Sequence, residues 1–68
     1  MRSLRNRVRR TCLVTMKSGA WVRGVLWEAD RTALVVRNAE TEGDRSTPTA
    51  VDGEVLILLA DVDFIQFP

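Results

Sequence analysis

The segment GAWVRGVLWEAD, residues 19–30, carries the strongest information about the fold of this 68-residue chain. Its valine, leucine and tryptophan residues favour a β-strand, yet Gly24 interrupts it at a position where glycine weakens a strand. A glycine there is typical of a strand that bends sharply, as the strands of a small barrel do. We therefore expect the strand to bend at Gly24, with Gly19 turning the chain into the strand and Asp30 turning it out.

The bend also assigns the side chains of this strand to two faces. The side chains expected to face the interior are Val22, Leu26 and Ala29. Trp21 and Trp27 then lie on the opposite face, which is too apolar for open solvent. An N-terminal helix covers part of this face through Leu4 and Val8, or the face binds a partner, or both. Trp21 and Trp27 are therefore candidate partner contacts.

Outside this segment, the chain is predicted to form one helix and four more strands. Residues 3–10, SLRNRVRR, predict a short helix. Residues 11–39 predict three strands joined by tight turns, 40–53 a variable polar loop, and 54–68 two further strands. Consecutive short strands with tight connections are typical of a small barrel. We expect a mainly β, single domain over residues 1–68, in which a short N-terminal α-helix precedes a five-stranded, strongly bent antiparallel barrel.

The small size of the chain favours association with other subunits. A domain of this length buries only about 60% of its unfolded surface and usually needs disulfides, a metal or oligomerisation for stability. The single cysteine, Cys12, cannot form an internal disulfide and is interpreted as a small buried hydrophobic residue. The chain has no histidine, and no metal or cofactor is expected. Self-association is therefore the expected means of stabilisation.

The charges are distributed unevenly along the chain. The basic residues of the first ten positions are Arg2, Arg5, Arg7, Arg9 and Arg10. The other 58 residues carry five basic and nine acidic side chains, a balance of −4. Such a basic arm favours a nucleic-acid backbone or an acidic protein surface as partner, and the simpler alternative is a solvated face. The aromatic residues are not interleaved with these arginines along the chain, which argues against a base-stacking platform.

Three stretches of the chain resemble the Sm and Sm-like family. The residues that follow the spacing of the family's first motif are Val14, Met16, Gly19, Val22, Gly24, Leu26, Ala29 and Asp30. The stretch LVVRNAE, residues 34–40, is similar to the family's third strand. The residues with the spacing of its second motif are Ile57, Val62, Phe64 and Ile65. The resemblance implies an Sm-like (SH3-like) barrel over nearly the whole chain.

The chain departs from this pattern where RNA-binding members of the family hold a base. In those members a Met-Asn pair follows the aspartate of the first motif, whereas RTALVV follows Asp30 here. Their second motif carries Arg-Gly where this chain has Leu58 and Leu59. An apolar pair supplies neither the hydrogen bonds nor the charge that hold a nucleotide. These departures argue against the family's central RNA site in this chain.

The resemblance also implies how the chain associates with itself. In the family, the fourth strand of one subunit pairs with the fifth strand of the next, and the ring has no free sheet edge. The segment EVLILL, residues 54–59, suits such a strand because it is apolar on both faces, and the alternative is that it lies in the core. The candidate self-association residues are Leu56, Ile57, Leu58, Val62 and Phe64.

A second, looser resemblance concerns the arrangement of the whole chain. Its basic start, its barrel and its C-terminal strands are similar to small proteins that phages of actinobacteria encode among their virion-assembly genes. The resemblance implies a structural role with capsid or other virion proteins as partners.

The residues offer no catalytic or membrane-inserting arrangement. The chain has no histidine, nucleophile motif or phosphate-binding loop, and Asp61 and Asp63 are interpreted as solvated turn residues. No apolar run has the length of a signal-peptide core or a membrane-spanning helix. We predict a cytoplasmic, non-enzymatic, self-associating structural protein without a small-molecule substrate. The alternative is an RNA-binding protein or RNA chaperone that uses the arginine-rich N-terminal face.

Overall fold

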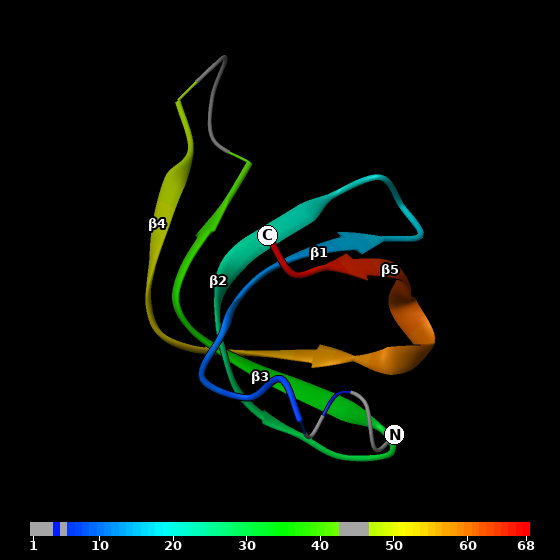
Figure 1. Cartoon of the computed structure of the whole chain (residues 1–68). Helices are drawn as coiled ribbons and strands as arrows, with labels where there is room; N and C mark the ends of the chain where they lie inside the picture. The colour runs from blue at the N-terminus through cyan, green and yellow to red at the C-terminus, as the bar shows by residue number, and fades with distance from the viewer. Residues whose placement is uncertain (1–3, 5, 43–46) are drawn as a thin grey trace.

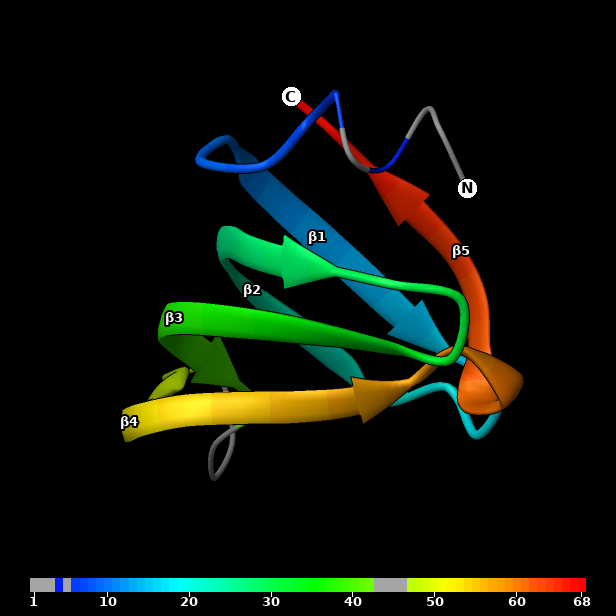
Figure 2. The same ribbon diagram turned by 90° about the horizontal axis from the view of Figure 1, so that it is seen from below.

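The structure, a computed structural model, describes residues 4, 6–42 and 47–68. The described residues form strands β1 (Thr11–Met16), β2 (Trp21–Ala29), β3 (Ala33–Thr41), β4 (Thr49–Leu58) and β5 (Val62–Gln66), with a 3-10 helix, η1 (Leu59–Asp61), before β5. The strands form an antiparallel sheet in the order β4-β3-β2-β1-β5 (Figure 1). The sheet curls around its core into an open barrel, with β1 and β5 across from β3 and β4 (Figure 2). No helix in the described part is long and apolar enough to span a membrane.

The helix predicted over residues 3–10 is not confirmed, because Leu4 is the one helical residue among those described and residues 6–9 form turns. The chain there makes consecutive turns, in which the Arg7 N–H donates to Leu4 O (3.0 Å) and the Arg10 N–H donates to Arg7 O (3.3 Å). Arg9 has a φ of 69°, a left-handed conformation that interrupts a right-handed helix. A helix of one or two turns also makes too few hydrogen bonds to offset the cost of nucleation. Arg2, Ser3 and Arg5 lie outside the described residues.

The N-terminal turns cover the core instead of the tryptophan face. Leu4 is only 7% exposed, and Val8 is half-buried against the core cluster. The Leu26 N–H donates to Arg10 O (2.9 Å) and the Arg9 N–H donates to Leu26 O, so the segment is held on β2. The apolar pair Leu4 and Val8 therefore completes the interior, and the outer face of β2 is left to other side chains.

The core consists of apolar side chains from β1 to β4 and the N-terminal turns. Its buried members are Leu4, Cys12, Val14, Leu26, Leu34, Val36, Ala39 and Ile57. The interior side chains predicted on β2 are confirmed, because Leu26 is fully buried and Val22 and Ala29 pack half-buried against the cluster. Cys12 is fully buried, and burial raises the pKa of its thiol.

The sheet bends along one line that crosses β2, β3 and β4. Gly24 is buried on this line, and a Cβ there would lie 2.7 Å from the Arg37 carbonyl oxygen. Opposite Gly24, β3 contains an extra residue and Asn38 has a φ of 52°. Opposite Asn38, β4 contains an extra residue and Gly53 has a φ of 76°. The bend predicted at one glycine is thus a feature of three strands, in which each bulge increases the local twist.

The loop between β3 and β4 is shorter than the predicted span of 40–53. β3 continues to Thr41, which pairs with Thr49 of β4, and Glu40 pairs with Ala50. The prediction was wrong because Gly53 and its neighbour Asp52 are typical loop residues in sequence, whereas here they form the bulge that carries β4 past the bend.

Candidate functional site

The two edge strands of the sheet expose apolar side chains on its outer face. Among the described residues, the large exposed hydrophobic side chains are Leu56 (66%), Leu58 (52%) and Phe64 (49%). All three belong to the strands predicted to carry self-association. Two other residues of that prediction do not face outward: Ile57 is buried in the core, and Val62 is half-buried against it. Alternation along β4 places Ile57 inside, between the outward-facing Leu56 and Leu58. In β5, Val62 and Phe64 lie on different faces because Asp63 is an extra residue where the register against β1 shifts.

The free edges of β4 and β5 match in length. In the described part of the chain, β4 pairs only with β3 and β5 only with β1, so each strand keeps one unpaired edge. The bulge at Gly53 divides β4 and leaves the five residues 54–58 as a regular edge, and β5 is also five residues long. Bulges are a common way to block an edge strand, whereas 54–58 has no bulge and is apolar apart from Glu54.

A second surface combines arginine side chains with aromatic rings. The Arg9 guanidinium lies 3.7 Å from the centroid of the Trp27 ring, and that of Arg37 lies 4.2 Å from it. We call these three residues the Trp27 cluster. Arg37 also forms an ion pair with Glu54 of β4 (2.7 Å). The cluster therefore extends from the N-terminal turns across β2 and β3 to the edge of the sheet.

The backbone around Trp27 explains the contact with Arg9. The register of β2 against β3 shifts between Leu26 and Glu28, so that Trp27 is the extra residue of a bulge. The left-handed conformation of Arg9, with its N–H bonded to Leu26 O, turns its side chain over the neighbouring ring. Such a conformation is unfavourable for a non-glycine residue, and the hydrogen bond and the ring contact offset its cost.

A second group of arginine–aromatic contacts lies where β5 ends. The guanidinium groups of Arg7 and Arg10 lie 5.4 Å and 5.7 Å from the centroid of the Phe67 ring, and we call these three residues the Phe67 cluster. The aromatic residues and these arginines are thus separate along the chain, as expected, but the fold brings them into contact. β-pairing and the N-terminal turns bring residues together that are up to 60 positions apart.

The two tryptophans do not form one surface. Trp21 lies at the opposite end of β2 from Trp27, beside a shallow groove of about 300 Å³ on the outer face of β1 and β2. The groove is lined by Leu13, Thr15, Gly19, Trp21 and Arg23. The Arg23 guanidinium lies 5.9 Å from the centroid of the Trp21 ring and forms an ion pair with Glu40. The predicted partner face is therefore divided into two regions.

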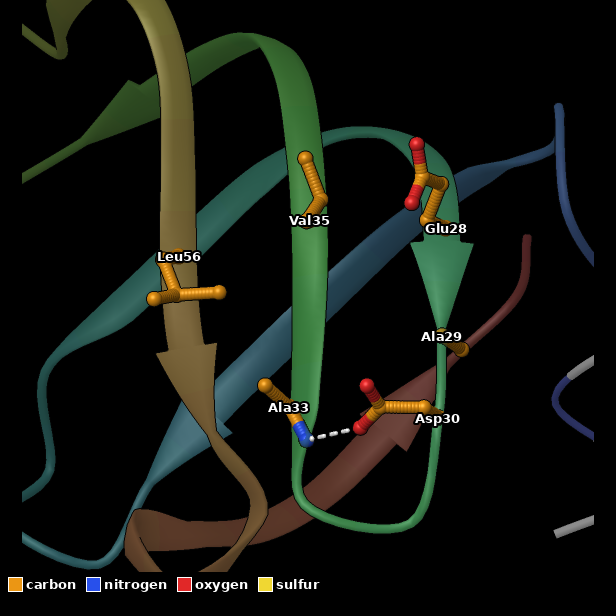
Figure 3. Close-up of a pocket in the computed structure, with 6 residues that line it drawn as sticks. All are labelled: Glu28, Ala29, Asp30, Ala33, Val35 and Leu56. Atoms are coloured by element: carbon orange, nitrogen blue, oxygen red, sulfur yellow. Dashed lines mark hydrogen bonds between the residues drawn. The ribbon is translucent and has the colours of Figure 1, made fainter.

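The turn between β2 and β3 is organised by Asp30. Its Oδ1 accepts hydrogen bonds from the Thr32 N–H (2.8 Å) and the Thr32 hydroxyl (3.1 Å). It also accepts one from the Ala33 N–H (2.9 Å), as Figure 3 shows. The Leu59 N–H donates to Thr32 O (2.8 Å), so this turn is tied to η1. These are the two segments where the base-binding residues of the Sm pattern are replaced. The side chains there hold the turn, and neither Leu58 nor Leu59 can donate a side-chain hydrogen bond to a nucleotide.

The pocket beside this turn has little room for chemistry. Its volume is about 90 Å³, and its lining residues are Glu28, Ala29, Asp30, Ala33, Val35 and Leu56 (Figure 3). That volume corresponds to about three water molecules. Within the described residues, no three acidic or cysteine side chains come together as a metal site.

Comparisons with known proteins identify the fold. No protein-family model and no curated protein matches the chain. A heptameric archaeal Sm protein of known crystal structure superposes with a TM-score of 0.86 at 22% identity, over 100% of this chain and 98% of that one. The fold is Sm-like. A chain of the NatC complex bound to CoA is also similar, with a TM-score of 0.79 at 19% identity, over 93% of this chain and 80% of that one.

The Sm-like fold confirms the predicted five-stranded bent sheet, except for its N-terminal helix. Among the described residues, the free edges of β4 and β5, the two arginine–aromatic clusters and the groove beside Trp21 offer surfaces for contacts to other molecules.

Proposed function

We propose that this chain is a non-enzymatic, self-associating Sm-like subunit with a structural or assembly role. The observation that carries the proposal is the pair of free edges of matched length, with Leu56, Leu58 and Phe64 exposed beside them. A free, apolar edge is unstable in water because its backbone groups and side chains are both available for pairing. Pairing of β5 with β4 of the next copy covers both.

The direction of the strands supports this arrangement. η1 reverses the chain, so that the second half of β4 and β5 run in opposite directions (Figure 1). A neighbouring copy can therefore place its β4 antiparallel to β5, the pairing used throughout this sheet. The contact joins two different surfaces of the same protein, and repeated rotation of such a contact closes a ring. The archaeal Sm protein with the same fold is heptameric.

Light scattering on a sizing column tests this proposal. We expect a molar mass that is a multiple of 7.7 kDa. A mass of 7.7 kDa at a protein concentration of about 100 μM, where even weak specific contacts are populated, would refute the proposal.

RNA binding is the second candidate function, and the Trp27 cluster is the observation that favours it. A guanidinium stacked on a ring can still bind phosphate through its N–H edge, and its plane can stack on bases. The N–H edge of Arg37 is engaged by Glu54, so Arg9 is the candidate phosphate contact. Arg9 is exposed to solvent and lies nearest to the ring. The surface is separate from the turn at Asp30, where the family's base-binding residues are missing.

Fluorescence anisotropy with labelled U-rich and A-rich RNA tests this second function. If the Trp27 cluster binds RNA, Arg9→Ala is expected to weaken binding about tenfold and Trp27→Leu by a similar factor, in line with the loss of one stacking or phosphate contact. Arg31→Ala, in the turn after β2, is the matched control and is expected to leave the Kd within about twofold. Equal effects of Arg9→Ala and Arg31→Ala would refute a defined site at Trp27.

A role in phage virion assembly and a cytoplasmic location stay predictions from the sequence. An exposed apolar edge and a basic surface both suit a capsid-associated protein. Co-purification with capsid proteins from infected cells would support the virion role, and an assembly free of them would contradict it.

A further inference from the structure

We propose that the seam between two copies is locked by ion pairs between the Phe67 cluster of one copy and the β4 bulge of the next. Arg10, with Arg7 beside it, supplies the positive charge, and Asp52 supplies the negative charge. The inference rests on the proposed pairing of β5 with β4. It adds the electrostatic contact that selects the register and the partner.

The arginines of the Phe67 cluster lie at the C-terminal end of β5. Phe67 directly follows β5, and the guanidinium of Arg10 lies 5.7 Å from the centroid of its ring. Stacking restrains a long side chain and leaves the N–H edge of the guanidinium free to bind a carboxylate. Arg10 is exposed and forms no ion pair with any described residue.

Asp52 occupies the bulge at the opposite edge of the sheet. The bulge places Asp52 and Gly53 opposite Asn38, and Asp52 is exposed. Within the described part of the chain, Asp52 makes no ion pair, whereas the neighbouring Glu54 is engaged by Arg37 (2.7 Å). Asp52 is therefore the carboxylate beside this edge that remains available to another copy.

The alternation of side chains determines how the two edges meet. Residues opposite one another in an antiparallel pair point to the same face. Phe64 is on the outer face and must lie opposite an outer residue of β4, such as Leu56. With Phe64 opposite Leu56, residues 64–66 of β5 pair with residues 54–56 of β4, and Gln66 lies opposite Glu54. This pairing lies between the extra residue of β5, Asp63, at one end and the β4 bulge at the other.

This register brings the opposite charges together. Continuing past Gln66 and Glu54, Phe67 of one copy meets Gly53 of the next, and Asp52 follows. Arg7 and Arg10 lie over Phe67, so they face the acidic bulge across the seam. The distribution of charge along the sequence agrees with this contact, because the first ten residues carry five basic side chains and the other 58 residues have a net charge of −4. One end of the seam is thus basic on one copy and acidic on the other.

An exposed ion pair contributes little affinity by itself but discriminates strongly against wrong alignments. A shift of the register by two residues would replace Asp52 at this place by Ala50, which is apolar, or by Glu54, which is already paired with Arg37. Like charges or unpaired charges at an interface disfavour such alternatives. The contact is near the surface, so its contribution is screened by salt.

Charge reversal and exchange test the inference. At about 0.1 M salt, Arg10→Glu is expected to raise the concentration at which half the assembly dissociates by about tenfold, and Asp52→Lys by a similar factor. The double variant, Arg10→Glu with Asp52→Lys, is expected to restore that concentration to within about threefold of the wild type. Arg31→Glu is the control, since it makes the same charge change at an exposed turn position. Sedimentation velocity over a dilution series gives the concentrations.

The outcomes separate this inference from the proposed function. If wild-type protein is a monomer, the proposed function and this inference both fail. If wild-type protein assembles but Arg10→Glu behaves like Arg31→Glu, only the ion-pair contact is refuted. Failure of the double variant to recover would also refute it, provided that circular dichroism shows the variant folded. The ion-pair contact is supported if assembly recovers in the double variant and if the difference between Arg10→Glu and Arg31→Glu disappears at about 0.5 M salt.

Discussion

Replacing Leu56 and Phe64 by lysine is expected to convert the assembly into a 7.7 kDa monomer. The two side chains are 66% and 49% exposed in the single chain, so their replacement removes little intramolecular packing. In the proposed seam both become buried, and burial of a leucine or phenylalanine contributes roughly 1.5–3 kcal/mol each. Lysine on an edge strand also opposes pairing by its charge. We expect association to weaken by a factor of at least about one hundred.

Light scattering measures the mass of this double variant against wild-type protein at equal concentration. Glu28→Lys with Thr47→Lys is the control, because it introduces two lysines at exposed positions outside both edges. Circular dichroism should show the same fold in all three proteins. A double variant of Leu56 and Phe64 that keeps the wild-type mass would contradict association through these strands.

Gly24→Ala is expected to destabilise the fold by about 3 kcal/mol, the upper range for an added methyl group in a packed interior. The new Cβ would lie 2.7 Å from both the Arg37 carbonyl oxygen and Val36 Cγ1, and 3.1 Å from Ala39 Cα. Two of these atoms belong to the backbone of β3, so the strand itself must shift. For a domain of this size the loss corresponds to a melting temperature lower by roughly 12–24 °C.

Thermal unfolding of the Leu56→Lys, Phe64→Lys monomer with and without Gly24→Ala checks this, because a monomer removes the dependence on concentration. Gly19→Ala is the matched control. Gly19 has a φ of 95°, but a Cβ added there would have no atom within 4 Å. Its replacement therefore strains only the turn and is expected to cost about 1 kcal/mol. Equal losses at the two glycines would refute the close approach of β2 and β3 as the reason for Gly24.

The parts of the fold set by local chemistry could be predicted from the sequence. A glycine within an apolar β segment indicated the bend, and alternation placed Leu26 in the core. Asp30 followed by a threonine two positions later is typical of a turn closed by the aspartate side chain. The exposed apolar residues of the edge strands followed from the resemblance to the Sm pattern, although alternation alone could have assigned Ile57 to the core.

The parts set by contacts between distant segments could not be predicted. Trp27 meets Arg9 and Arg37 only because the N-terminal turns hydrogen-bond to β2 and a bulge shifts the register. Phe67 meets Arg7 and Arg10 only because β5 pairs with β1. The N-terminal segment had a helical pattern but lacked the length to form a helix by itself, so tertiary contacts determined its shape.

Cysteine cross-linking tests most directly whether β5 of one copy pairs with β4 of the next. We would combine Leu56→Cys with Phe64→Cys and retain Cys12, which is fully buried and whose thiol pKa is raised by burial. Mild oxidation is expected to give a ladder of disulfide-linked multimers on a non-reducing gel, because opposite positions in antiparallel strands suit a disulfide. Glu28→Cys with Phe64→Cys should give no ladder. Pairing of these two edges would be contradicted if the Leu56→Cys, Phe64→Cys variant also runs as a single chain on that gel although the oxidised protein elutes as an assembly.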